Sequence, residues 1–136
     1  MVISAQGKVF CGGLDMQMFS TAKEFHATSP QEREVLQVNL ERMQDALNAL
    51  ERARFPVIAA VQGACIGGGF DLIAACDMRY AAEDAQFSIK EIDIGMAADV
   101  GTLQRLPRII GDGMLRELAY TGRTFGAEEA RSMGLV

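Results

Sequence analysis

Three carboxylates lie close to a run of glycines, among mainly apolar neighbours. Asp71 follows the glycine triplet at 67–69, Glu91 stands in SIKEIDIG, and Asp99 stands in MAADVG. A carboxyl group among apolar residues has a raised pKa and can serve as a general base or acid. Backbone N–H groups of a glycine run at a helix start can hold a developing negative charge. Together these groups suit removal of a proton next to a carbonyl group and storage of the resulting enolate.

The glycine triplet stands between two segments of regular structure. An apolar run at 57–61, bounded by Pro56 and Gly63, predicts a short buried strand. The mostly apolar segment at 70–76 has the length and composition of a helix. The chain is therefore expected to leave a strand and begin a helix through residues without side chains, where the helix dipole favours negative charge.

Each of these features also has an ordinary structural explanation. Glycine triplets are common in turns and tight packing, and a single acid is commonly a solvated charge or a helix cap. The triplet lacks the Gly-Lys-Ser/Thr ending of a Walker A loop and the spacing of a dinucleotide-binding fingerprint. It is the combination of the acids with the glycines that favours proton transfer beside a carbonyl group.

Expected strands alternate with expected helices along the rest of the chain. Further strands are predicted at 2–4, 77–80 and 86–89. Helices are predicted at 30–54, 102–111, 112–120 and 127–133, with a short helical turn at 14–19. Pro107 is expected to shorten or kink the helix that contains it. This alternation favours an α/β fold.

The longest predicted helix has a clear start and one apolar stripe. Ser29 and Glu32 form a capping box, with Pro30 at the first helical position. Apolar residues then recur at spacings of four and three: Leu36, Leu40, Met43, Leu47 and Leu50. We expect this stripe to pack in the core rather than to bind a partner.

Length and charge limit the classes of protein to which the chain can belong. At 136 residues it can form one domain with a sizeable core. A net charge of −5 argues against nucleic acid or an anionic membrane surface as the main partner. No run of eighteen apolar residues occurs, so no membrane span is expected.

Neither the cysteines nor the histidine predict a metal centre. Cys11, Cys65 and Cys76 lack C-x-x-C spacing and are expected to be reduced thiols of an intracellular protein. Asp15 is expected to cap or brace its loop rather than to do chemistry. The single histidine, His26, lies in a polar segment and is expected to be solvated, and no cluster with ligand spacing predicts a metal site.

Nearly the whole chain resembles the crotonase (enoyl-CoA hydratase/isomerase) superfamily. The stretches that carry the resemblance are GKVFCGGLDM, PVIAAVQGACIGGGFDLIAACDMRY, FSIKEIDIGMAADVGTLQRLPRIIG and TGRTFGAEEARSMGLV. Within the superfamily the chain is most similar to the Δ3,5-Δ2,4-dienoyl-CoA isomerases, and AADVGTLQRLP around Asp99 is the most specific match. The resemblance implies an α/β fold built as a crotonase (ClpP/crotonase-like) spiral of ββα units.

The resemblance also implies an oxyanion hole made of two backbone N–H groups. One belongs to Leu14, after the glycine of the GGLD loop, and the other to Gly68, the middle glycine of the triplet. Gly13, Gly67 and Gly69 are then expected to lie against the substrate.

The acids separate this chain from typical hydratases of the superfamily. Hydratases carry a glutamate three residues after the middle glycine, where this chain has Asp71, and a second glutamate twenty residues further on, here Glu91. Dienoyl-CoA isomerases resemble this chain at both positions and carry a third acid eight residues later, here Asp99. The resemblance assigns the C2 proton to Glu91 and the C6 proton to Asp99, and leaves Asp71 to tune the site.

The implied activity is conversion of a 3,5-dienoyl-CoA to the 2,4-dienoyl-CoA in fatty acid β-oxidation. Coenzyme A is part of the substrate, so no separate cofactor is expected. An acyl-CoA is the expected partner, and a homotrimer or hexamer is the expected assembly. The expected location is intracellular: cytoplasmic in a bacterium, mitochondrial or peroxisomal in a eukaryote.

Two other functions compete with this one. The first is an enoyl-CoA hydratase or Δ3-Δ2 enoyl-CoA isomerase, against which aspartate at position 71 counts. The second is a non-catalytic crotonase relative that binds RNA or protein, against which the three acids and the acidic balance count.

The resemblance further implies that residues 1–136 are a partial crotonase core domain, incomplete at both ends. Earlier strands that touch coenzyme A and a C-terminal helical part used in trimer packing are expected to be missing. These 136 residues alone are therefore expected to form a poor enzyme with low solubility and no defined trimer.

Overall fold

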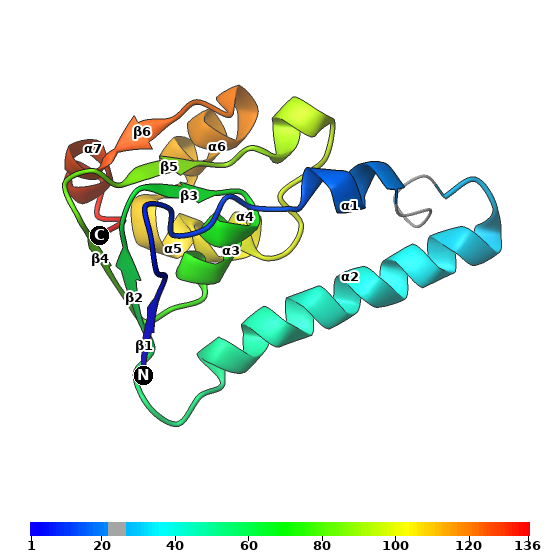
Figure 1. The fold of residues 1–136 in the computed structure, drawn as a ribbon, viewed down its shortest axis with the longest axis horizontal. Coiled ribbons are helices and arrows are strands. Elements are labelled where there is room, and N and C mark those ends of the chain that lie inside the picture. The colour runs from blue at the N-terminus through cyan, green and yellow to red at the C-terminus, as the bar shows by residue number, and fades with distance from the viewer. Residues whose placement is uncertain (22–26) are drawn as a thin grey trace.

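Two small sheets form the centre of the chain in the computed structural model, which describes residues 1–21 and 27–136 (Figure 1). His26, expected to be solvated, lies outside the described residues. The first sheet is parallel and has the order β1-β2-β4, with β1 at Val2–Ser4, β2 at Ile58–Val61 and β4 at Met78–Ala81. The apolar run predicted as a buried strand is thus its central strand.

The second sheet has the order β3-β5-β6, with β3 at Ala64–Ile66, β5 at Gln86–Ser88 and β6 at Phe125–Gly126. Strands β3 and β5 are parallel, and β5 and β6 are antiparallel. Neither β3 nor β6 was predicted, because β3 is only three residues long and follows β2 after a two-residue break. Gly63 makes that break with a φ of +55°, and a Cβ there would lie 1.9 Å from the Lys8 carbonyl oxygen.

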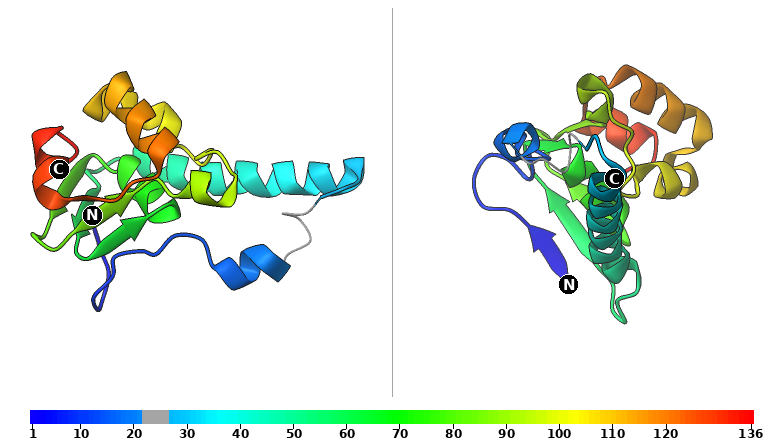
Figure 2. Two further views of the ribbon diagram at one scale, coloured as in Figure 1. Left: turned by 90° about the horizontal axis from the view of Figure 1, so that it is seen from above. Right: turned by 90° about the vertical axis from the view of Figure 1, so that its right-hand side faces the viewer.

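Helices connect and cover the strands (Figures 1 and 2). Their bounds are α1 Met16–Thr21, α2 Pro30–Glu51, α3 Gly68–Ala74, α4 Thr102–Arg105, α5 Pro107–Ile110, α6 Asp112–Thr121 and α7 Ala127–Ser132, with a 3-10 turn, η2, at Glu91–Ile94. Pro107 divides the predicted helix at 102–111 into α4 and α5, as expected. Strands and helices alternate along most of the chain, which confirms the α/β class.

Three aromatic rings pack together in the core between α3 and the second sheet. Phe70 of α3 meets Phe87 of β5 edge-on with ring centroids 6.2 Å apart, and Phe87 stacks on Phe125 of β6 at 5.5 Å. All three side chains are buried. Edge-on and offset aromatic pairs stabilise a core beyond the area that they bury, so this cluster holds α3 against β5.

Helix α2 begins as predicted but does not enter the core. The capping box of Ser29 and Glu32 is present, and the helix ends at Glu51, three residues before the predicted end. The expectation that its apolar stripe packs in the core is wrong: no residue of α2 is buried, and Leu50 alone of the stripe packs against the core cluster. The reason is visible in Figures 1 and 2, where most of α2 extends past the two sheets, with α1 as its neighbour.

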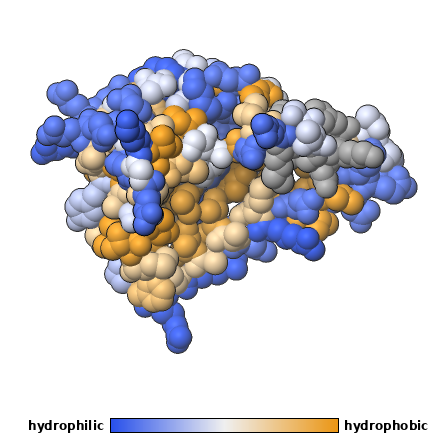
Figure 3. Space-filling model, viewed as in Figure 1, coloured by the Kyte–Doolittle hydropathy of each residue, from blue (hydrophilic) through white to orange (hydrophobic). Residues whose placement is uncertain are grey.

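Apolar side chains are also exposed on the first sheet. In the view of Figure 3, apolar surface gathers over β1, β2 and the segments that adjoin them. Val2 of β1 is 62% exposed and Tyr80 of β4 is 63% exposed. Strands β1 and β4 are the two edges of this sheet, so apolar side chains and open strand edges occur together here.

Candidate active site

The loop at 11–14 runs beside β3 and brings Gly13 to the start of α3. The N–H of Cys11 donates to the carbonyl of Ala64, and the N–H of Ile66 donates to the carbonyl of Cys11, each at 2.9 Å. Gly13 has a φ of +89°, and a Cβ there would lie 2.9 Å from the Ile66 carbonyl oxygen and 3.7 Å from the Gly68 nitrogen. Only glycine fits this approach. The structure therefore brings Gly13, and Leu14 next to it, to the backbone of Gly68.

The glycine triplet is used differently at each position. Gly67 caps α3 with a φ of 51°, and its N–H donates to the carbonyl of Ser88 at 3.0 Å. A Cβ on Gly69 would lie 2.7 Å from the Cβ of Cys11, so Gly69 permits the loop to pack on the helix. A Cβ on Gly68 would meet no atom within 4 Å. The triplet is thus closely packed on both sides and open at its middle residue.

Glu91 places its carboxyl group against this glycine backbone. It begins η2, three residues after β5 ends at Ser88. A Cβ on Gly67 would lie 3.2 Å from Oε1 of Glu91. The other oxygen, Oε2, is buried and has no hydrogen-bond partner among the described residues. Burial raises the pKa of Glu91, and the nearby charges of Asp71 and Asp99 raise this pKa further.

Asp71 is the most deeply buried of the three acids, at 1% exposure. Its Oδ1 accepts the backbone N–H of Thr102 at 2.8 Å, which joins α3 to the start of α4. Burial raises the pKa of Asp71; hydrogen bonds from Thr102 lower this pKa, the charge of Asp99 raises it, and the charge of Arg105 lowers it. The prediction that apolar surroundings raise at least one of the acid pKa values is confirmed for both Asp71 and Glu91.

Asp99 lies in the loop between η2 and α4 and is half-buried. Its N–H donates to the carbonyl of Ala97 at 2.9 Å, and its own carbonyl accepts the Nε2 of Gln44 at 2.7 Å. Thr102, three residues after Asp99, binds Oδ1 of Asp71 in α3. Glu91 lies against Gly67 at the start of the same helix, and the charge of Asp99 raises the pKa of both other acids. The structure thus gathers the acids that the sequence analysis singled out.

Asp15 and the cysteines, the other residues singled out in the sequence, lie in surroundings that favour a structural role. Oδ1 of Asp15 accepts the N–H of Gln17 at 2.8 Å at the start of α1, as expected of a cap. The three cysteines are free thiols, and two of them, Cys65 and Cys76, are buried. Within residues 1–21 and 27–136, no group of three or more His, Cys, Asp or Glu side chains could hold a metal ion. In the same part of the chain, no helix is long and apolar enough to cross a membrane.

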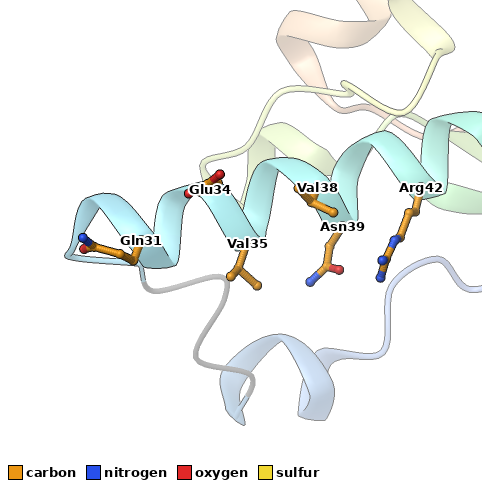
Figure 4. A pocket seen from close by; sticks show the side chains of 6 residues that line it. All are labelled: Gln31, Glu34, Val35, Val38, Asn39 and Arg42. Atoms are coloured by element: carbon orange, nitrogen blue, oxygen red, sulfur yellow. The ribbon is translucent and has the colours of Figure 1, made fainter.

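Two surface hollows lie apart from the glycine backbone. The larger, of about 470 Å³, is lined, among the described residues, by side chains of α2 (Figure 4): Gln31, Glu34, Val35, Val38, Asn39 and Arg42. The smaller, of about 300 Å³, lies between α2 and the start of α4 and is bordered by Asp99. The larger hollow includes none of the predicted site residues, so its size does not mark it as the place where chemistry occurs.

Sequence reasoning missed the residues that hold the acids in place. Thr102 binds Asp71, Gln44 binds the carbonyl of Asp99, and Arg105 lies close to both acids. Gln44 is 55 residues away from Asp99 in the sequence, so no local pattern could have paired them. For Thr102 the sequence offered one signal: it directly follows Gly101 at a predicted helix start, where backbone N–H groups are free to bind an acid.

A loop glycine beside a glycine-led helix, with three acids around them, is the arrangement that the sequence led us to expect. A model of the enoyl-CoA hydratase/isomerase family matches residues 1–136. The chain belongs to the enoyl-CoA hydratase/isomerase family. The match covers both sheets and the loop that carries Asp99.

Several curated relatives of this family member are named dienoyl-CoA isomerases, and others are named hydratases. It is 49% identical to the peroxisomal Δ3,5-Δ2,4-dienoyl-CoA isomerase of Arabidopsis thaliana, over 100% of this chain and 50% of the relative. It is 46% identical to the mitochondrial enzyme of that name from Homo sapiens, over 100% of this chain and 42% of the relative. The chain therefore spans about half the length of the curated relatives that it matches.

The fold of this family member also matches solved structures. A putative enoyl-CoA hydratase from Thermobifida fusca YX, in complex with acetoacetyl-CoA, aligns with a TM-score of 0.90 at 33% identity. The alignment covers 99% of this chain and 54% of the other. The expected crotonase fold is thereby confirmed.

Proposed function

We propose that the protein containing this chain is an isomerase that converts a 3,5-dienoyl-CoA to the 2,4-dienoyl-CoA. The observation that carries the proposal is the half-buried Glu91 carboxyl group, which lies beside Gly67, has a buried oxygen without a partner among the described residues, and has a raised pKa. Such a group is available to take a proton from a substrate in contact with the glycine backbone. The similarity to curated dienoyl-CoA isomerases supports the choice of substrate.

The thioester oxygen would accept the N–H groups of Leu14 and Gly68. Support comes from the approach of Gly13 to the Gly68 nitrogen and from the open space beside Gly68. As Glu91 removes a proton from C2, negative charge moves onto the thioester oxygen, where these two donors stabilise it. One donor of this kind typically lowers the barrier by about 3 kcal/mol. Gly13, Gly67 and Gly69 would permit the close contact with the substrate.

A proton returned at C6 by Asp99 would complete the reaction. Loss of the C2 proton and gain of a C6 proton move the double bonds from the 3,5 to the 2,4 positions, with no net gain or loss of atoms. The two acids regain their starting protonation states by exchange with solvent. Asp71, whose Oδ1 is held by the Thr102 N–H, would keep its place and adjust the pKa of Glu91.

Hydration of an enoyl-CoA is the second candidate, because the chain is also 36% identical to a probable enoyl-CoA hydratase of Bacillus subtilis. Two observations favour isomerisation. Position 71 carries a short, buried aspartate whose oxygen is already bound, and a third acid lies within electrostatic reach of the other two.

An assay of the full natural protein on both substrate classes tests the proposal. We expect rapid change of the dienoyl absorbance with a 3,5-dienoyl-CoA and little addition of water to a 2-enoyl-CoA. Glu91→Gln and Asp99→Asn should each abolish most of the isomerisation. Fast hydration with slow isomerisation would favour the hydratase, and near-normal isomerisation by both variants would contradict the roles of the acids.

The proposal extends to the substrate class, the assembly and the location of the whole protein. We expect its substrate to be an acyl-CoA, with no separate cofactor, because proton transfer by carboxyl groups needs none. We further propose a partial crotonase core at 1–136 within a homotrimer or hexamer. Its expected location is the cytoplasm of a bacterium, or the mitochondrion or peroxisome of a eukaryote, and the two curated relatives above are named as peroxisomal and mitochondrial.

A further inference from the structure

We infer that Arg105 is a positioning residue, which ties the loop at 99–101 to helix α2 and thereby sets the place of Asp99. The inference rests on the proposed function in one respect, that Asp99 acts on the substrate. That Arg105 holds the loop at 99–101 follows from its contacts alone.

The guanidinium group of Arg105 is enclosed by the loop and the helix. Its side chain is 10% exposed. One terminal nitrogen, Nη2, donates to Oδ1 of Asn48 at 2.6 Å and to Oε2 of Glu51 at 3.1 Å, both on α2. The other, Nη1, donates to the carbonyl of Val100 at 3.3 Å. The fork of this side chain therefore joins two elements that are far apart in the sequence.

Gly101 completes the seat of the guanidinium. It has a φ of +135°, and a Cβ at this position would overlap Nη1 of Arg105, at 1.5 Å. The guanidinium thus fills the space that a side chain at 101 would need, directly before Thr102 binds Asp71. A displacement of Arg105 would consequently shift the loop and so disturb the positions of both Asp99 and Asp71.

Helix α2 holds the same loop a second time through Gln44. Its Nε2 donates to the carbonyl of Asp99 at 2.7 Å. Gln44, Asn48 and Glu51 are spaced by four and three residues and so share one face of the helix. The carbonyls of Asp99 and Val100 are therefore both fixed to α2, one directly and one through Arg105.

Stability alone gives a poor account of an arginine at this position. Its Nε is buried and has no hydrogen-bond partner among the described residues. A buried charge that lacks part of its hydrogen bonding is costly, and an apolar side chain of similar size is often equally stable. The charge of Arg105 also lowers the pKa of the buried Asp71. Positioning of the loop that carries Asp99, rather than stability, explains the contacts that Arg105 makes.

Arg105→Met in the full natural protein tests the inference, with Arg108→Met as the matched control. Methionine keeps the length of the stem and removes the fork, and Arg108 borders the same hollow without a hydrogen bond or ion pair among the described residues. We expect Arg105→Met to lower kcat on 3,5-dienoyl-CoA by about 10- to 100-fold, with KM changed less than about threefold. Arg108→Met should retain kcat.

Two further measurements separate positioning from a general loss of structure. In an Asp99→Asn background, Arg105→Met should lower kcat little further, because it acts through Asp99. Amide hydrogen exchange at 99–102 should speed up in Arg105→Met while the amides of α6 stay protected. Additive losses of kcat, or unchanged exchange at 99–102, would overturn the inference.

Two gentler variants keep the test decisive if Arg105→Met does not fold. Asn48→Ala removes one anchor of the guanidinium, and Arg105→Lys retains the charge without the fork. Each should speed exchange at 99–102 and lower kcat by a smaller factor, and unchanged exchange in both would overturn the inference. The exchange measurement also separates the two claims: faster exchange in a protein that is inactive on dienoyl-CoA supports the role of Arg105 and refutes the proposed function.

Discussion

Glu91 differs from a surface glutamate in two ways that affect its chemistry. Its carboxyl group is partly removed from water, and two other acids lie near enough to disfavour its charge. Both effects raise its pKa above the ordinary value of 4.5. A base with a raised pKa binds a proton more strongly. This favours transfer of the proton from the weakly acidic C2 carbon to the base.

The pH dependence of kcat/KM should reveal this raised pKa. Glu91 must be ionised to take a proton, so activity should fall on the acid side at a pH above 4.5. Asp71→Asn removes a like charge and should move this acid limb to lower pH. The profile of the free enzyme should be compared for wild type and variant, and an acid limb that stays in place would show that Asp71 does not tune Glu91.

Asp71 should also make stability depend on pH. Because its pKa is raised in the folded state, the folded protein binds more protons than the unfolded chain between pH 3.8 and the raised pKa. The free energy of unfolding should therefore fall as pH rises through this window. Asp71→Asn can still accept the Thr102 N–H, so its stability relative to wild type should increase from pH 3.5 to pH 7. Urea denaturation at both pH values measures this, and a constant difference would contradict the raised pKa.

The start of α3 is the element that the proposed site depends on most. Gly67 has a φ of 51°, and a Cβ there would press on Oε1 of Glu91. We expect Gly67→Ala to cost about 1–3 kcal/mol of stability and to lower kcat by displacing Glu91. Gly113 in α6 is a matched control, because a Cβ there meets no atom within 4 Å, and Gly113→Ala should stabilise by about 0.4–1 kcal/mol. Equal stability of the two variants in thermal melts would show that Gly67 is not strained.

Helices and strands with signals within a few residues could be predicted from the sequence. Features that depend on long-range packing, such as the burial of a helix face, could not. The capping box of Ser29 and the strand around Ala59 were recognised because their signals lie within a few residues. Strand β6 has only two residues, and β3 stands between Gly63 and the glycine triplet, where no local signal marks a strand. The stripe of α2 has the spacing of a core face, but spacing does not say whether another element covers it.

The candidate site could be predicted further than the fold around it. Asp71, Glu91 and Asp99 were chosen for their type and spacing beside the glycines, and the structure brings them together. Their supports, Gln44 of α2 and Arg105 of α4, come from two helices far apart in the sequence, and the contacts between these helices depend on tertiary packing. The sequence pattern thus pointed to the proposed reacting groups, and the three-dimensional structure was needed to identify the residues that hold them.

At the scale of the whole molecule, the exposed apolar surface should govern the behaviour of residues 1–136 on their own. Both edges of the first sheet are open in the described part of the chain, and Val2 and Tyr80 are mostly exposed. Open strand edges with apolar side chains invite association. We expect the isolated 136 residues to aggregate and to turn over dienoyl-CoA weakly. A soluble, symmetric oligomer with ordinary enzyme rates in sedimentation and absorbance assays would contradict this.

Hydrogen exchange at C2 of the substrate tests the central claim most directly, because it separates the two acids in one experiment. The full natural protein would be incubated with a 3,5-dienoyl-CoA in D₂O, and deuterium at C2 and C6 followed by mass spectrometry. Glu91→Gln should largely prevent both C2 exchange and isomerisation, whereas Asp99→Asn should retain C2 exchange and form the 2,4-dienoyl product only slowly. Exchange at C2 that persists in Glu91→Gln, or full isomerisation by Asp99→Asn, would contradict the account.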